Sequence, residues 1–135
     1  MKTSHITYQG NLRTSATHLR SENTIITDAP TDNHGKGEAF SPTDLLATSI
    51  ASCMITIMGI QSEKNDLEMG EVTAEVEKIM ASNPRRVAAV NILLNFENHN
   101  LSDTDKSLLE NAALNCPVCC SLHPDLKVHV KFQYI

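Results

Sequence analysis

The side chains in this sequence whose type best suits chemistry are four cysteines, Cys53, Cys116, Cys119 and Cys120. A cysteine thiolate is a nucleophile and a ligand for soft metal ions, whereas a thiol buried among apolar groups is inert. The polar residues at positions 1–5 lack the apolar segment of a signal peptide, so we expect a cytoplasmic protein. In that compartment cysteine clusters tend to be catalytic, redox-active or metal-binding rather than disulfide-bridged.

Cys53 allows two interpretations from its neighbours in the sequence. It lies on an apolar stripe in the middle of a predicted long helix, where it could be an inert core residue. To react as a thiolate it needs a nearby cation or hydrogen-bond donor. Because Cys53 is far from both ends of the helix, the helix itself supplies neither.

Cys116 precedes Pro117 and is predicted to be the N-cap of a short helix, where backbone N–H groups and the helix dipole favour a thiolate. Residues 116–119 form a C-x-x-C sequence. This sequence follows a helix, whereas a thioredoxin-like motif lies at a strand-to-helix turn. An alternative is a metal site, because four possible ligands recur here at helical spacing: Cys116, Cys119, Cys120 and His123.

Composition excludes several classes of protein. A chain of 135 residues suits one domain, residues 1–135, with a full hydrophobic core and no need for disulfides. The net charge is -5 and no basic run occurs, so we expect neither a nucleic acid nor an anionic membrane as partner. With no Trp, two Tyr and three Phe, the chain also lacks the aromatic residues that stack on bases.

Three short strands are predicted in the N-terminal third, and a long helix follows them. Ser41 and Asp44 form a capping-box pattern around Pro42, and an apolar stripe continues at helical spacing through Leu46, Ile50, Cys53, Ile57 and Ile60. Residues 45–62 carry no charge, which is long enough for a membrane span. Several Ser and Thr residues and the lack of flanking basic or aromatic anchors favour instead a helix in the middle of a soluble core.

The second half predicts a hairpin, a helix and a final strand. Residues 72–76 and 90–96 alternate apolar and polar side chains on either side of a turn at 82–84, a second helix starts at Ser102, and residues 128–134 alternate again. The element order βββ-α-ββ-α-β predicts an α+β fold with antiparallel sheet. Because sheet from one chain would cover only part of a long helix that is apolar all round, we expect a homodimer with paired helices between the strands of both chains.

Two segments of this sequence resemble the OsmC/Ohr family, the osmotically inducible and organic hydroperoxide resistance proteins. Residues 41–47 (SPTDLLA), followed by 51–53 (ASC), are similar to the family's first active-site helix. Residues 113–118 (ALNCPV) are similar to its second cysteine motif. The resemblance covers nearly the whole chain and implies an intertwined homodimer, with sheet around two central helices and active sites at the subunit interface.

The resemblance implies a thiol peroxidase that reduces organic hydroperoxides in oxidative-stress defence. By position, Cys53 would be the peroxidatic thiolate and Cys116 the resolving thiol. Arg13 best matches the arginine that supports the first thiolate in the family, and Arg20 is the alternative. No cofactor is implied, and an external dithiol such as dihydrolipoamide would reduce the resulting disulfide.

Two positions depart from the family pattern and indicate a divergent OsmC-like branch. Thr43 stands where peroxidase members carry the glutamate that fixes the arginine, and Cys119 stands where the second motif normally has Ser. Two further functions therefore stay open: a Cys/His metal- or thiol-binding module, and a ligand-binding OsmC-like relative without peroxidase activity.

Overall fold

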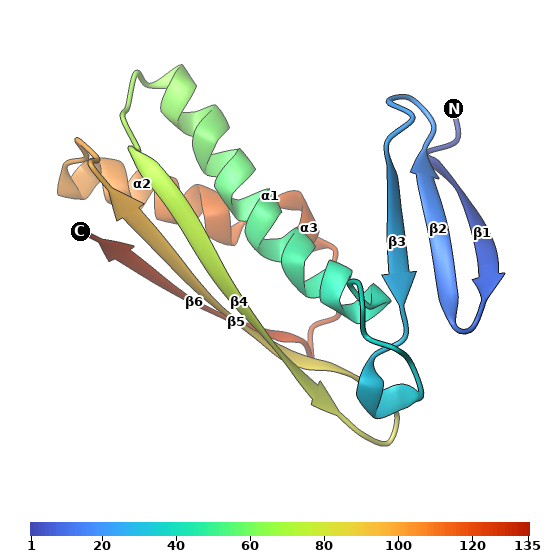
Figure 1. Ribbon diagram of the computed structural model, residues 1–135. Helices are drawn as coiled ribbons and strands as arrows, with labels where there is room; N and C mark the ends of the chain where they lie inside the picture. Colours follow the sequence, from blue (N-terminus) through green and yellow to red (C-terminus); the bar gives the residue numbers. More distant parts are fainter. The chain divides into compact units, whose positions relative to one another are not determined.

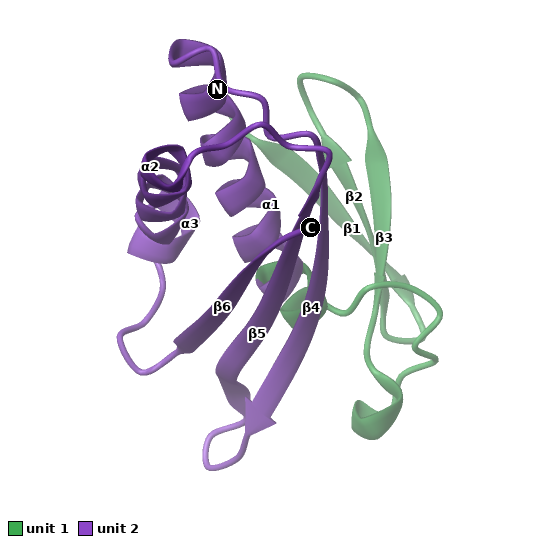
Figure 2. Cartoon of the chain, turned by 90° about the vertical axis from the view of Figure 1, so that its left-hand side faces the viewer, with its two compact units in different colours: residues 1–46 green, residues 47–135 purple.

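The computed structural model describes all 135 residues. Its elements follow the order β1(Ser4–Gly10), β2(Arg13–His18), β3(Thr24–Asp28), a 3-10 turn at Thr31–Asn33, α1(Pro42–Lys64), β4(Glu71–Ala81), β5(Arg86–Glu97), α2(Asp103–Leu114), α3(Pro117–Cys120) and β6(Lys127–Tyr134). The chain divides into two compact units, residues 1–46 and 47–135 (Figures 1 and 2). The α+β fold class and the predicted order of the elements are confirmed.

The first unit holds a three-stranded antiparallel sheet in the order β1-β2-β3. The tight turn after β1 requires positive φ at Gly10, Asn11 and Leu12, and glycine and asparagine accept this conformation most readily. Ile6 pairs with Ala16 and Ala16 pairs with Ile25, so these side chains share one face of the sheet. That face is exposed, since Ile6 is 61% and Ile25 50% accessible.

Helix α1 begins where the sequence predicts it. The Ser41 hydroxyl accepts a hydrogen bond from the Asp44 N–H at 3.0 Å, and the Asp44 carboxylate accepts one from the Ser41 N–H at 2.9 Å. This reciprocal capping box satisfies two N–H groups that the first turn would leave unpaired. Pro42 fits the first helical position because its missing N–H costs nothing there.

The buried face of α1 differs from the predicted stripe. The buried residues are Ala47, Ile50, Ala51, Met54, Met58 and Ser62. In contrast, Leu46 is 38% and Ile60 42% exposed, and Cys53 and Ile57 are half-buried. The sequence pattern could not distinguish the two stripes, because α1 is apolar all round and tertiary packing selected the one rich in Ala and Met.

The core of the second unit lies between its sheet and its helices. Alternate residues of β5, Val90, Ile92, Leu94 and Phe96, form one buried cluster with α1 and with Leu109 and Ala113 of α2. Because all four β5 residues point to the same side, α1 and α2 cover the same face of the sheet (Figure 1). The opposite face of β4 carries Glu71, Glu75 and Glu77, all exposed as the alternation predicts.

The last strand corrects the expectation of a purely antiparallel sheet. The order in the second sheet is β4-β5-β6, and β4 pairs with β5 antiparallel, but β6 pairs with β5 in parallel. The reason is topological, since α2 and α3 lie between β5 and β6 and carry the chain back to the end where β5 begins. Alternating residues predict a strand, but they do not predict its direction.

Helix α1 also passes a test of length and composition for membrane helices. Its apolar window has a mean hydropathy of 1.5, and 28% of that window is buried within the chain. The face of α1 that is buried packs on β5 in the core described above. We therefore interpret α1 as a helix of a protein core.

Candidate functional site

The second unit brings its four cysteines into one cluster. Pro117 separates α2 from α3, and Cys116 is the N-cap of α3, as the sequence predicts. The Cys116 side chain is fully buried, and its sulfur accepts a hydrogen bond from the Cys119 N–H at 3.5 Å. Cys53 of α1 reaches the same place, since the Cys116 thiol and the Val118 N–H lie near enough to its thiol to influence its pKa.

The environment of Cys53 does not by itself favour a thiolate. Burial is the largest influence and raises its pKa above the usual value. The Val118 N–H opposes this because it donates to the sulfur, whereas the hydrogen bond with Cys116 and the charges of Cys116 and Cys120 raise the pKa further. Within the second unit, Cys53 is therefore a protonated thiol near neutral pH.

Cys119 is also held in the thiol form. Burial, a hydrogen bond with Cys116 and the nearby charges of Cys116, Cys53 and Cys120 raise the pKa of Cys119 to about 12. Cys116 thus lies near two other thiols, those of Cys53 and Cys119, and influences the pKa of both. Cys120 differs, because it is exposed and its thiol donates to the Asn115 carbonyl at 3.5 Å.

The alternative of a metal site at the C-terminal cysteines is not supported by this geometry. No group of three or more His, Cys, Asp or Glu side chains is arranged to hold a metal ion. His123 is 73% exposed, and its Nδ1 accepts a hydrogen bond from the Asp125 N–H at 3.0 Å. Helical spacing suggested a shared face, but α3 ends at Cys120, so His123 no longer follows the helix.

A hollow of about 270 Å³ opens beside Cys119. Neither Cys53 nor Cys116 lines it, so Cys119 is the thiol of the buried cluster that faces this space. Its lining mixes polar and apolar surface and comes from α1, the end of α2, α3, β6 and the segment between the last two: Met54, Leu114, Cys119, Leu122, His123, Pro124, Leu126 and Val128.

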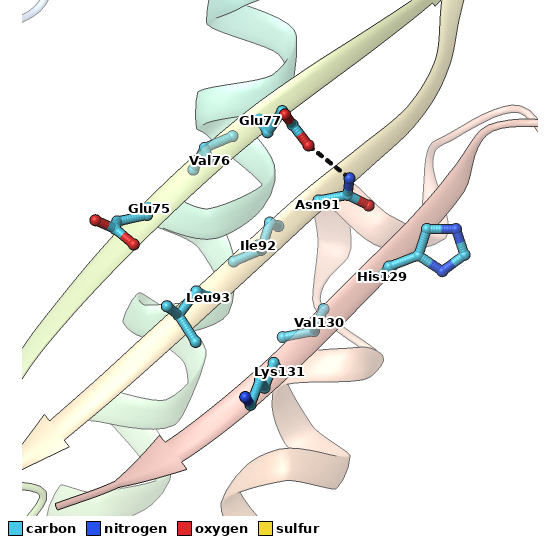
Figure 3. A pocket seen from close by; sticks show the side chains of 9 residues that line it. All are labelled: Glu75, Val76, Glu77, Asn91, Ile92, Leu93, His129, Val130 and Lys131. Atoms are coloured by element: carbon cyan, nitrogen blue, oxygen red, sulfur yellow. Dashed lines mark hydrogen bonds between the residues drawn. The ribbon is translucent and has the colours of Figure 1, made fainter.

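A second hollow, of about 510 Å³, lies on the β4-β5-β6 sheet and contains no cysteine (Figure 3). Glu75 and Glu77 of β4 stand along one side and His129 and Lys131 of β6 along the other. The Asn91 amide between them donates to the Glu77 carboxylate at 2.8 Å. The lining offers charged groups but no thiol, so we assign it no part in the thiol chemistry.

Arg13 lies in the first unit and has a partner that the sequence did not suggest. Its Nε and Nη2 donate to the two carboxylate oxygens of Asp28 at 2.7 and 2.8 Å, and the Glu38 N–H donates to the same carboxylate at 3.1 Å. The Asp28 side chain is only 2% exposed, against 30% for Arg13. Hydrogen bonding by Arg13 is the main influence that lowers the pKa of Asp28, and the same pair raises the pKa of Arg13.

The carboxylate that orients Arg13 therefore comes from β3. Arg13 and Asp28 are cross-strand partners at the start of β2 and the end of β3, so the register of an antiparallel pair places them opposite each other. An assignment of strand register could have found this pair.

The other residues that the sequence suggested near the arginine have different surroundings. The capping box of α1 engages Asp44, and the Thr43 hydroxyl lies 3.2 Å from the Ser41 hydroxyl. The alternative Arg20 lies exposed in a turn. Arg13 belongs to the first unit and Cys53 to the second, and their pairing stays a prediction.

The comparisons with known proteins bear on this arrangement. The family model described as OsmC-like protein matches residues 35–131, which include Cys53 and all of the C-terminal cysteines.

This chain belongs to the OsmC-like protein family.

Solved structures agree with this OsmC-like assignment. A crystal structure named as a candidate osmotic stress induced and detoxification response protein from Psychrobacter arcticus is 56% identical. It has a TM-score of 0.93, over 98% of this chain and 96% of that one. An organic hydroperoxide resistance protein OsmC from Legionella pneumophila has 16% identity and a TM-score of 0.73, over 98% of each chain. An OsmC-like protein from Mycoplasma pneumoniae has 17% identity and a TM-score of 0.79, over 99% and 98%. The last two show the fold alone. The comparison with curated proteins gives no match.

Proposed function

We propose that this OsmC-like protein reduces organic hydroperoxides by a two-cysteine mechanism, as part of oxidative-stress defence. The observation that carries the proposal is the proximity of the Cys53 and Cys116 thiols, which come from α1 and from the N-cap of α3 and lie near enough for Cys116 to influence the pKa of Cys53. Two thiols that lie near each other can close a disulfide after a modest movement. Neighbours of the same fold that are named organic hydroperoxide resistance proteins support the choice of substrate.

The chemistry balances with these two residues and an external reductant. The Cys53 thiolate attacks one oxygen of the hydroperoxide, an S–O bond forms as the O–O bond breaks, and the alcohol leaves with a proton. Cys53 is now a sulfenic acid. The Cys116 sulfur then attacks Cys53, an S–S bond forms, and water leaves. A dithiol such as dihydrolipoamide reduces this disulfide by exchange and becomes a disulfide itself.

Arg13 supplies the positive charge that Cys53 needs in this proposal. Burial raises the pKa of Cys53, so a cation must offset it before the thiolate forms near neutral pH. Asp28 binds Arg13 through Nε and Nη2, which holds the guanidinium in a fixed orientation and leaves Nη1 outside these two bonds. Asp28 thus serves as the positioning carboxylate that Thr43 cannot provide.

A homodimer in the cytoplasm completes the proposal. The first unit contains no buried hydrophobic residue, although Ile6, Tyr8 and Ile25 are apolar and 50–64% exposed. One side of α1 is also only half covered. Apolar side chains on a three-stranded sheet need to be buried against another surface. We propose that a second copy of the chain supplies this surface, as the sequence predicts for the long apolar helix.

Consumption of cumene hydroperoxide with reduced dihydrolipoamide as electron donor tests the function. We expect the wild-type protein and Cys120→Ser to turn over, because Cys120 has no part in the mechanism. Cys53→Ser should fall to the uncatalysed rate. Cys116→Ser should react once and leave a Cys53 sulfenic acid that dimedone traps. Steady-state consumption that survives Cys53→Ser would overturn the proposal.

A further inference from the structure

Cys119 is a half-buried thiol that the two-cysteine mechanism leaves without a task. It lies three residues after Cys116, and Cys116 is also the thiol that lies near Cys53. Its own N–H donates to the Cys116 sulfur at 3.5 Å, so the first turn of α3 already holds these two residues together. Cys120 lacks such contacts, since its thiol donates to the Asn115 carbonyl.

We propose that Cys119 is a second resolving cysteine, which takes over the disulfide from Cys53 and presents it in the hollow beside α3. This inference rests on the proposed function and deepens it. Cys53 oxidised by the hydroperoxide first forms a disulfide with Cys116. The Cys119 sulfur then attacks the Cys116 sulfur, the Cys116–Cys119 bond forms and the Cys53–Cys116 bond breaks. The proton lost by Cys119 is balanced by the proton that Cys53 regains, and no further oxidant is consumed.

The geometry suits this exchange because the sulfur that is attacked, that of Cys116, lies near both other thiols. Only the Cys116 sulfur has to exchange its disulfide partner, from Cys53 to Cys119. A side-chain pair three residues apart in a helical turn lies about 5–6 Å apart between Cβ atoms, and modest tightening brings it into disulfide range. The C-x-x-C spacing with the first cysteine at the helix N-cap is the arrangement that readily forms reversible disulfides.

Oxidation of Cys53 also removes part of what keeps Cys119 protonated. Burial is the main cause of its high pKa and persists, but the hydrogen bond with Cys116 and the charges of Cys116 and Cys53 also contribute. In a Cys53–Cys116 disulfide neither sulfur carries a negative charge or a proton. The Cys119 thiolate is therefore easier to form after the first disulfide has closed than before.

Transfer to Cys119 has a chemical consequence for the reductant. Cys116 is fully buried, whereas Cys119 lines the hollow of about 270 Å³. A dithiol with a hydrocarbon chain can reach the Cys119 sulfur in this hollow more easily than it can reach a sulfur enclosed between α1 and α3. Cys53 is regenerated before the reductant arrives.

Disulfide mapping of the full-length protein tests the inference, with Cys120→Ser as background so that the exposed thiol forms no unrelated bridges. One equivalent of cumene hydroperoxide is added, free thiols are alkylated, and peptides are identified without reduction. We expect a Cys116–Cys119 disulfide and alkylated Cys53. When Cys119→Ser is combined with Cys120→Ser, the main product should instead be the Cys53–Cys116 disulfide.

A parallel sample oxidised with diamide separates the two proposals, because diamide closes dithiols without peroxide chemistry. Cys116–Cys119 as the product of both oxidants supports the relay. If hydroperoxide is consumed through Cys53 but Cys53–Cys116 is the lasting product in both samples, the relay is wrong and the function stands. If diamide gives Cys116–Cys119 and no hydroperoxide is consumed, the exchange pair stands and the peroxidase function is wrong.

Discussion

At the scale of single residues, the proposed reactivity of Cys53 requires a group that offsets the effect of its burial. Its local environment raises its pKa, chiefly by burial, and the Val118 N–H only partly compensates. A peroxidatic cysteine has to be a thiolate, since the thiol is not the nucleophile. The proposal therefore makes Arg13 the residue on which activity at neutral pH depends.

Replacement of Arg13 by Met should raise the apparent pKa of Cys53. Because a nearby cation stabilises the thiolate, its loss should move this pKa upward by on the order of one unit or more, and alkylation at pH 7 should become slower. The rate of Cys53 alkylation by iodoacetamide, followed by mass spectrometry as a function of pH, measures the shift. Arg20→Met is the control, because Arg20 lies in an exposed turn. Identical profiles for wild type and Arg13→Met would remove Arg13 from the site.

The Asp28 carboxylate should stabilise the fold in a pH-dependent way. Its pKa in the folded protein lies below the ordinary value of 3.8, so its stabilisation is complete above that pH and is lost as the pH falls further through the folded pKa. Asp28→Asn should therefore lower the melting temperature at pH 7 but make little difference near pH 2. Thermal unfolding at a series of pH values checks this, and Asp32→Asn in the exposed 3-10 turn serves as control. An equal deficit at both pH values would contradict the interpretation.

At the scale of elements, helix ends and strand connections determine where the thiols lie. Pro117 ends the helical run that began at α2, and the new start at α3 makes Cys116 an N-cap. Helix α2 is itself fixed by a capping box, in which Ser102 and Asp105 exchange hydrogen bonds of 3.0 and 3.1 Å. A hydrogen bond also links α2 to the second sheet, since the Tyr134 hydroxyl of β6 donates to the Glu110 carboxylate of α2 at 2.8 Å.

Removal of the cap of α2 should destabilise the protein by about 1 kcal/mol, the usual cost of replacing an N-cap serine with alanine. The variant is Ser102→Ala, and urea unfolding followed by circular dichroism gives the free energy of unfolding. Ser107→Ala, at an exposed position inside the same helix, is the matched control, and its free energy should stay close to wild type. A loss as large in Ser107→Ala as in Ser102→Ala would show that the cap is not the cause.

At the scale of the whole molecule, buried hydrophobic residues are confined to one of the two units. Every buried hydrophobic residue lies between Ala47 and Cys116, in the second unit. The first unit holds its strands together by backbone pairing and by polar contacts such as the Arg13–Asp28 pair. A three-stranded sheet without a buried face is marginal in water.

Ile6 and Thr7 offer a matched test of the proposed homodimer, because they are neighbours on β1 that point to opposite faces of the sheet. Ile6→Lys places a charge on the apolar face and should weaken association, so that the protein sediments as a monomer at micromolar concentration. Thr7→Lys adds the same charge to the opposite face and should sediment like the wild type. A wild-type protein that is already monomeric under these conditions would contradict the dimer.

The sequence by itself determined most of the secondary structure, whereas the roles of Cys53 and Cys116 stay a prediction from the family resemblance. The signals that predict these elements are local: the capping patterns at Ser41 and Ser102, the proline after Cys116, and the alternation in 72–76 and 90–96. Such signals can be recognised in a sequence because helix caps and side-chain periodicity involve only neighbouring residues. The resemblance to the OsmC/Ohr family came from two such local segments and was confirmed by the match over residues 35–131.

Only the tertiary structure decided which faces are buried and which distant residues meet. Three features depend on contacts across the chain. Strand β6 pairs with β5 in parallel, and Arg13 pairs with Asp28. Helix α1 buries Met54 and Met58 and leaves Leu46 and Ile60 exposed. The same holds for Cys53 and Cys116, which lie 63 positions apart in the sequence and near each other in the structure. Spacing along a chain fixes the direction of a side chain relative to its own element, whereas its partners depend on how the elements pack.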